Sequence, residues 1–220
     1  DDYDLEVLYT RFGNVPMGSG KDVFYVNMAR AYHYNPLDPD ELTKAEIMLR
    51  DQVYRIIKFL RQQIPGCKNA YLVTTNPSLG IRESRRIMGE YVLQSEDVLD
   101  GKFFDNAVFR SSVAYAGGGP AHPVEPKEGG KGSTYERKQK EWVEYEIPYE
   151  VEVPKKIENL LVAGKCRSAS HGAMALTKSA PVCMAEGQSA GTSAALSLKE
   201  NVSPRGLDVR KLQKTLVRDG

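Results

Sequence analysis

The sequence lacks a charge excess, a long apolar run and a recognisable leader, and each absence excludes a class of protein. Its 220 residues carry 30 Lys and Arg against 29 Asp and Glu, so no overall field would attract nucleic acid or an anionic membrane. No apolar run approaches the roughly 20 residues of a membrane-spanning helix. The N-terminal DDYDLEVLYTR has neither the basic start nor the apolar core of a signal peptide. We therefore expect a globular protein that neither spans a membrane nor binds nucleic acid.

Cysteines and histidines are also scarce. The three cysteines are an odd number without a CxxC pair, which favours a reducing compartment, and hence the cytoplasm, over a disulfide framework or a zinc site. The three histidines lie far apart in the sequence without paired ligands nearby, so we expect no metal site. These residues are Cys67, Cys166, Cys183, His33, His122 and His171.

No phosphate-binding glycine loop is present. Residues 117–119 are a glycine triplet, but Pro120 and Pro123 follow and forbid the helix that a dinucleotide-binding motif requires. The GSGK at residues 18–21 lacks the spacing and the Ser or Thr of a Walker loop, and predicts a hairpin turn. The ADP half of a dinucleotide therefore has no cradle in this sequence.

The N-terminal half contains one strong helix prediction. Apolar residues recur at helical spacing over Pro39–Gln63, with Asp38 or Asp40 available as the N-cap and a Pro-Gly pair just beyond the end. Residues 4–10 and 22–27 alternate as strands do, and residues 70–74 also predict a strand. We expect residues 80–93 to be extended chain carrying an arginine cluster, and residues 95–97 to form the acidic first turn of a short helix.

The following residues predict a long loop and then a strand. Gly, Pro, Lys and Glu dominate residues 116–139, the composition of a loop or lid. Residues 142–153 alternate apolar side chains with glutamates, the period of a half-exposed strand whose glutamate face should meet solvent. Residues 207–217 predict a terminal amphipathic helix.

The most informative stretch, residues 159–198, predicts a buried strand followed by a helix of small residues. The strand at residues 160–163 would bring Gly164 to the sheet edge where ligands bind, and glycine lets the backbone approach a ligand closely. Pro181 suits a first helical turn, whose free amides favour a negative charge. Gly187 and Gly191 would let the helix press closely against a sheet or a cofactor. A close-packed core helix without a ligand fits the composition equally well.

The same stretch contains GxSxG around Ser189, the pattern of a serine-hydrolase nucleophile elbow. An α/β-hydrolase places its acid and then its histidine after the serine, whereas the last histidine here, His171, precedes it. The triad order cannot be built. We interpret Ser189 as one small residue on a tightly packed helix, and a hydrolase as a distant alternative.

Several segments, in order along the chain, resemble one family. NLLVAGKCRSASHGA and APVCMAEGQSAGTSAA carry the resemblance, preceded by GIRESRRIMGEYVL, SEDVLDGKFFDNAV and EIPYEVEVP. From about Ala45 onward the chain is similar to FAD-dependent oxidoreductases related to fumarate-reductase-type flavoproteins, and an ordered match is more specific than a single glycine motif. Lys165 and Arg167 stand where the family has arginine and isoleucine, and Gly172 replaces an acidic or large residue.

The resemblance implies FAD as cofactor and an α/β fold with an α+β substrate-domain portion. A C-terminal strand and small-residue helix would close an incomplete, Rossmann-like FAD-binding domain. Residues 1–153 would form the substrate or cap portion, and residues 154–220 would complete the FAD-binding domain. The residues that it implies for contact with FAD are Ala163, Gly164, Lys165, Cys166, Arg167, Ser168, Pro181, Gly187, Gln188, Gly191 and Thr192.

Three arginines and two histidines are the candidates for chemistry. A guanidinium stays charged, holds a carboxylate by two hydrogen bonds and stabilises an anion. On an extended strand Arg82 and Arg86 share one face and Arg85 opposes them, although a solvated basic face fits equally well. His171 could pass a proton beside the flavin, and His122 could enter from the glycine-rich loop, with a purely structural histidine as the alternative for each.

The absent GxGxxG motif predicts that another chain or segment supplies the ADP half of the site. The chain begins at Asp1 rather than Met, which favours a processed or partial polypeptide. We expect part of an oligomeric oxidoreductase that transfers a hydride between FAD and a small organic, possibly anionic, substrate. A noncatalytic scaffold subunit that kept the fold without the cofactor is the alternative.

Overall fold

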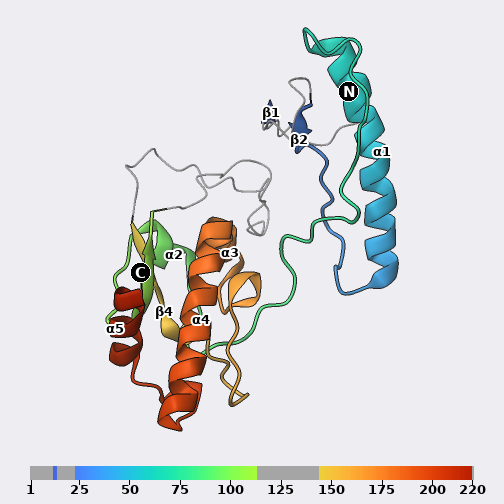
Figure 1. The fold of residues 1–220 in the computed structure, drawn as a ribbon. Helices are drawn as coiled ribbons and strands as arrows, with labels where there is room; N and C mark the ends of the chain where they lie inside the picture. Colours follow the sequence, from blue (N-terminus) through green and yellow to red (C-terminus); the bar gives the residue numbers. More distant parts are fainter. Residues whose placement is uncertain (1–11, 14–22, 113–143, 220) are drawn as a thin grey trace. The chain divides into compact units, whose positions relative to one another are not determined.

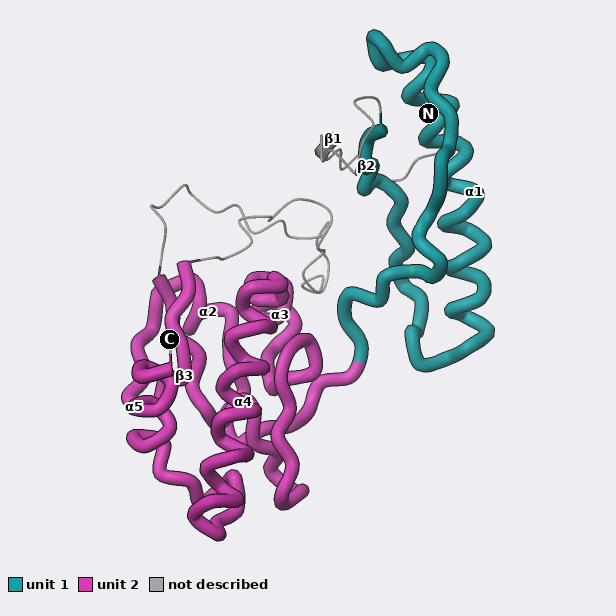
Figure 2. The backbone as a smooth tube through the Cα atoms, viewed as in Figure 1, with its two compact units in different colours: residues 1–84 teal, residues 85–220 magenta. Residues whose placement is uncertain are grey.

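The computed structural model describes residues 12–13, 23–112 and 144–219, which belong to two compact units. The first unit comprises Asp1–Ser84 and the second Arg85–Gly220 (Figure 2). The boundary expected at residues 153 and 154 lies inside the second unit. The division into a substrate portion and an FAD-binding portion at that boundary stays a prediction. None of the described helices is both long and apolar enough to cross a bilayer.

In the first unit, α1 (Pro39–Gln63) has the bounds that the sequence predicts (Figure 1). The carboxylate of Asp38 accepts hydrogen bonds from the amides of Asp40 and Glu41, satisfying two first-turn donors. Ile56 and Leu60 on α1 pack with Met28 in a small core. The helix thus combines a capped start with one apolar face.

The strands of the first unit are short. β1 (Phe12–Gly13) pairs antiparallel with β2 (Tyr25–Val26), so residues 22–27 contain the expected strand over two residues. The expected strand at residues 4–10 lies outside the described residues. Residues 70–74 form no strand, and the side chain of Tyr71 is 76% exposed. That prediction was wrong because an extended segment becomes a strand only beside a partner, and the described part of this unit supplies none.

The second unit is built on a two-stranded antiparallel sheet of β3 (Ala107–Ser111) and β4 (Tyr145–Pro148), with a register shift between Ala107 and Phe109. The chain then turns into η1 (Tyr149–Val151). The strand expected over residues 142–153 is therefore confirmed only at residues 145–148 among those described. It ends at Pro148, which has no amide hydrogen for the ladder.

The glutamate face expected on this strand meets solvent at Glu144, whereas Glu146 and Glu152 lie in the interior. Glu146 is buried and accepts hydrogen bonds from the amide of Phe104, at 2.7 Å, and from Arg110. Glu152 is fully buried. For Glu146 and Glu152 the prediction was wrong, because alternation alone cannot reveal that distant segments supply hydrogen-bond donors to these two carboxylates.

Residues 85–93 are extended, as expected, and cross the second unit without forming a long ladder. Gly89 bridges Pro154, and Leu93 bridges Ala169 in parallel. A Cβ on Gly89 would lie 2.7 Å from the Cβ of Ser168 and 2.8 Å from the carbonyl oxygen of Glu150. Only glycine allows this approach without displacing a neighbour.

Helical segments make up most of the rest of the second unit (Figure 1). α2 (Ser95–Leu99) confirms the expected short helix, α3 (His171–Thr177) has no counterpart in the sequence prediction, and α4 (Ala180–Glu200) is the expected small-residue helix. η3 (Pro204–Gly206) and α5 (Val209–Asp219) follow, the latter close to the expected bounds. Together these residues make a mixed helical fold with a small antiparallel sheet, compatible with the α/β class.

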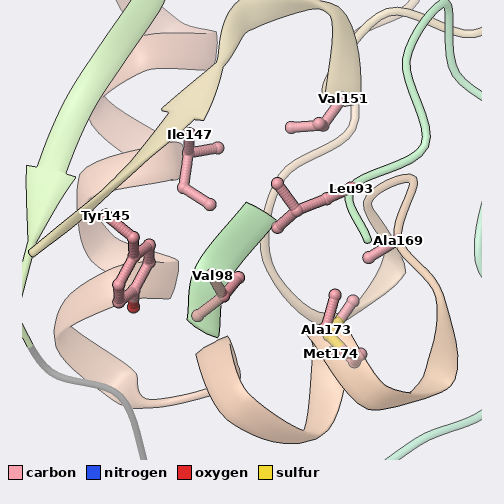
Figure 3. Close-up of a cluster of buried hydrophobic side chains, with 8 residues drawn as sticks. All are labelled: Leu93, Val98, Tyr145, Ile147, Val151, Ala169, Ala173 and Met174. Carbon is pink, nitrogen blue, oxygen red and sulfur yellow. The ribbon is translucent and has the colours of Figure 1, made fainter. Parts of the chain in front are cut away.

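Two apolar clusters hold this unit together. Between β4, α2 and α3 lie the side chains drawn in Figure 3, namely Leu93, Val98, Tyr145, Ile147, Val151, Ala169, Ala173 and Met174. The other cluster joins β3 to α5 through Val108, Tyr149, Val153, Leu207 and Leu212. α3 contributes side chains to the first cluster, and α4 contacts β3. Both helices are therefore held by packing within the second unit.

Candidate functional site

The candidate site begins at a turn rather than at the expected strand end. Residues 160–163 form no strand, and one amide there, that of Val162, donates to the carbonyl of Glu152. The strand prediction was wrong because no ladder runs beside this apolar run in the described chain. Gly164 then opens η2 (Gly164–Cys166) with a φ of 78°, a conformation that favours glycine.

A buried ion pair fixes this turn to α4. The Gly164 amide donates to Glu186 Oε2 at 2.6 Å, and Arg167 Nη1 lies 2.6 Å from Glu186 Oε1. Both side chains of the pair are 0% exposed. Arg167 Nη2 also donates to the carbonyl and hydroxyl oxygens of Thr177 at the end of α3. One guanidinium therefore connects η2, α3 and α4.

A second carboxyl group lies in the same interior. Ser189 Oγ donates to Glu152 Oε2 at 3.0 Å, and both residues are fully buried. Burial raises the pKa of Glu152 well above its ordinary value of 4.5, and the negative charge of Glu186 adds to the shift. Burial also raises the pKa of Glu186, against the opposing effects of Arg167 and the Gly164 amide. The environment thus favours the protonated form of Glu152.

This burial also bears on the hydrolase alternative. A nucleophilic serine needs an exposed hydroxyl beside a general base. The Ser189 hydroxyl is buried and is used to hydrogen-bond Glu152. The interpretation of Ser189 as a packed small residue accounts for what is observed.

The N-terminus of α4 lies against the glycine turn. A Cβ on Gly164 would lie 3.9 Å from the Cβ of Cys183 in the first turns of α4. Ser179 is the N-cap residue, yet its side chain makes no capping hydrogen bond. Its buried hydroxyl has no hydrogen-bond partner within the described ranges, nor does that of Ser168. Pro181 occupies the first turn, as expected.

The outward side of α4 presents small residues. Gly187, Gln188 and Gly191 are exposed, and a Cβ on either glycine would meet no described atom within 4 Å. The two glycines therefore do not pack against the rest of this unit. The opposite side of α4, which carries Ser189 and Ser193, is buried in the unit. Thr192 lies half-buried between the two sides. Among the described residues, none occupies the space next to Gly187 and Gly191, so another group could approach α4 closely there.

A separate pocket of about 340 Å³ contains two of the candidate catalytic residues. Arg86 and His171 line it, together with residues from the starts of α2 and α3, namely Gln94, Ser95, Glu96, Ser170 and Gly172. A Cβ on Gly172 would overlap Ser95 Oγ, so glycine lets the two helices meet beneath the pocket. The structure therefore brings together Arg86 and His171, which are 85 residues apart in the sequence.

The remaining predicted site residues have different surroundings. Lys165 and Cys166 are exposed on η2, whereas Ala163 is half-buried and Ser168 is fully buried. Arg85 is exposed in the second unit, and Arg82 belongs to the first unit. His122 lies outside the described residues. No group of three His, Cys, Asp or Glu residues within the described ranges could hold a metal ion.

Sequence reasoning missed Glu152, Glu186 and Thr177. Glu186 carried a usable signal, because it is a lone carboxylate in the otherwise small and apolar PVCMAEGQSAG. A charge in such a segment needs a buried partner, and Arg167 occupies the preceding buried segment. Thr177 carried no signal, since its role depends on where α3 ends.

The second unit thus combines three features: a start of α4 without a side-chain cap, a left-handed glycine turn at Gly164 and a polar pocket lined by Arg86 and His171. The chain matches the family of FAD dependent oxidoreductases over residues 2–216. It belongs to that family, and FAD is the cofactor that membership implies. No curated protein and no solved structure matches the chain.

Proposed function

We propose that this chain forms one wall of an FAD site in an oxidoreductase that transfers a hydride between FAD and a small anionic substrate. The observation that carries the proposal is the uncapped N-terminus of α4 beside the Gly164 turn. Free amides at a helix start favour negative charge, and the buried, unpartnered Ser179 hydroxyl adds a polar group there. FAD, when bound, supplies the two-electron chemistry that side chains lack.

Residues of three kinds would hold the cofactor. Lys165 offers a positive charge and Cys166 a small exposed side chain on η2, while Ala163 and Gly164 offer backbone. On the exposed side of α4, Gly187 and Gly191 have no side chains and would let the cofactor approach the helix backbone closely, next to Gln188. Arg167 and Ser168, which are buried, would act by shaping the turn rather than from its surface. The residues present therefore fit a large anionic cofactor.

The pocket lined by Arg86 and His171 would receive the substrate. A guanidinium can orient a carboxylate by paired hydrogen bonds, which fixes the rest of the molecule. The imidazole of His171 can hold or move the proton that leaves or enters the substrate with the hydride. The polar lining from Ser95 and Ser170 suits a small polar molecule.

The other wall of the cofactor site would come from a dinucleotide-binding part on another chain or segment. On α4, Met184 is 74% exposed and Leu198 is 84% exposed, with the two glycines between them. An apolar helix side of this kind is typical of a surface that another element covers. A complete Rossmann-like domain follows from this proposal, and an oligomeric enzyme follows where another chain supplies the missing part.

Copurification tests the proposal. The chain is expressed with its natural partners, every polypeptide in the purified assembly is identified by mass, and flavin fluorescence is measured after denaturation. We expect FAD in the assembly, a polypeptide or segment carrying GxGxxG, and little FAD on this chain alone. A flavin-free assembly would favour the noncatalytic scaffold, and tight FAD binding by the isolated chain would exclude a missing wall.

A further inference from the structure

We propose that Arg167 and Glu186 are positioning residues that set the Gly164 turn for the cofactor, an inference that rests on the proposed function. Glu186 receives the Gly164 amide at 2.6 Å through one oxygen and faces Arg167 at 2.6 Å through the other. The pair therefore fixes both the direction of the Gly164 amide and the depth of the turn against α4.

Arg167 extends this control to the neighbouring elements. Its own amide donates to the Gly164 carbonyl at 3.2 Å, and Nη1 approaches the same carbonyl at 3.4 Å. Its other guanidinium nitrogen binds Thr177, the last residue of α3. His171 begins α3 and Ser179 begins the approach to α4. Every element proposed to face FAD or the substrate within residues 163–181 is thus tied to one buried guanidinium.

Packing alone would not require charged residues here. A buried ion pair contributes little net stability, and well-packed apolar residues of similar size often replace one without loss. The Arg167–Glu186 pair supplies directional contacts that apolar residues cannot, namely an acceptor for the Gly164 amide and a donor to its carbonyl. Both contacts act on Gly164, whose φ of 78° lies in the left-handed region.

The decisive variant removes the pair and keeps its volume. Arg167→Met with Glu186→Leu should fold, because no charge is left buried alone, but the Gly164 amide loses its acceptor. The matched control is Lys211→Met with Glu200→Leu, which removes an exposed pair that joins α5 to the opposite end of α4. Far-ultraviolet circular dichroism and thermal unfolding establish that each variant is folded.

Two measurements then separate positioning from folding. In the full assembly, we expect the dissociation constant for FAD to rise roughly tenfold to a hundredfold, with a changed visible circular dichroism band of the flavin. In the chain itself, hydrogen exchange at Gly164 should accelerate by roughly tenfold or more. The Lys211 and Glu200 variant should match the wild type in both.

A folded double variant with wild-type FAD affinity and flavin spectrum would overturn the positioning role alone. A wild-type assembly that contains no FAD would overturn the proposed function and the positioning role together, so the two failures are distinguishable. If the double variant does not fold, Glu186→Asp serves instead, since it keeps the charge beside Arg167 and draws the carboxylate back from Gly164. Unchanged FAD affinity in that variant would also overturn the inference.

Discussion

Ser189 and Glu152 form a hydrogen bond of 3.0 Å in the interior of the second unit, 37 residues apart in the sequence. Glu152 is fully buried, so water does not reach its carboxyl group. A group of this kind makes folding sensitive to pH, since ionising it in the folded state costs free energy.

The stability of the second unit should depend on pH through Glu152. A carboxyl group whose pKa is raised by folding stabilises the native state most below its ordinary value of 4.5, and that stability is lost as pH rises toward the folded-state pKa. The wild-type free energy of unfolding should therefore fall above pH 4.5, by up to about 1.4 kcal/mol per pH unit for one group. Glu152→Gln should flatten this slope, as urea unfolding across a pH series would reveal. Glu144→Gln, at an exposed site, should keep the wild-type slope, and equal slopes in Glu152→Gln and wild type would contradict the prediction.

Gly89→Ala should destabilise the second unit. The new methyl group would overlap Ser168 and the Glu150 carbonyl. Such overpacking lowers the free energy of unfolding by about 1–3 kcal/mol. Thermal unfolding measures the loss. Gly187→Ala is the matched control, because its methyl group meets open space beside the described residues and should add up to about 1 kcal/mol of helix stability. Equal melting temperatures for the two variants would argue against the close packing at Gly89.

Gly191→Leu should leave the chain folded but weaken its association with the proposed dinucleotide-binding part. Leucine fits an exposed helix position, yet it would hold an incoming surface away from α4. Quantitative copurification measures the association, and Arg210→Leu, exposed on α5, controls for added apolar surface. Full association of the Gly191 variant would show that this side of α4 is not the interface.

His171→Ala should slow the reduction of bound flavin by substrate. Loss of a group that moves a proton typically lowers the rate by about 10² to 10⁴, whereas FAD occupancy should remain near the wild-type level. Anaerobic stopped-flow absorbance reports the reduction rate directly. Lys214→Ala provides a control on α5, and an unchanged rate in the His171 variant would remove this residue from the mechanism.

Arg86→Gln should weaken substrate binding more than it slows the chemical step. Losing a hydrogen bond to a charged group costs about 1.5–3 kcal/mol, so KM for an anionic substrate should rise by roughly tenfold or more. A neutral analogue of the substrate should show a smaller change. Arg218→Gln removes an exposed guanidinium that pairs with Asp219 and should leave KM unaltered. Equal effects on both substrates would exclude a carboxylate contact by Arg86.

Local patterns predicted α1, α2, α4 and α5 but missed α3. α1 announces itself by a capping aspartate, apolar residues at helical spacing and a Pro-Gly pair beyond its end, and α4 by a proline in its first turn. These signals lie within a few residues of the element that they specify. Of the site, the sequence indicated Gly164 and the helix α4, because glycine permits backbone conformations that other residues avoid and proline fixes φ in a first helical turn.

Predictions that needed a distant partner failed. Residues 70–74 and 160–163 have the composition of strands, yet neither finds a ladder among the described residues. Glu146 and Glu152 were expected in solvent, but a segment 42 residues earlier and one 37 residues later supply their donors. The assignment of Glu186 to Arg167 likewise depends on the packing of α4 against η2, which no local pattern encodes.

The extended segment at residues 85–93 has a consequence for how the protein is made. Leu93 hydrogen-bonds only to residues 168 and 170 in its bridge, and Gln213 on α5 bonds the Asp105 carbonyl across 108 residues. When the ribosome has released residues 85–111, their apolar side chains have no core to join until the C-terminal residues emerge. The segment is therefore exposed to aggregation until synthesis of the unit is complete. A chain that ended shortly before α4 would have an incomplete core rather than form a smaller domain.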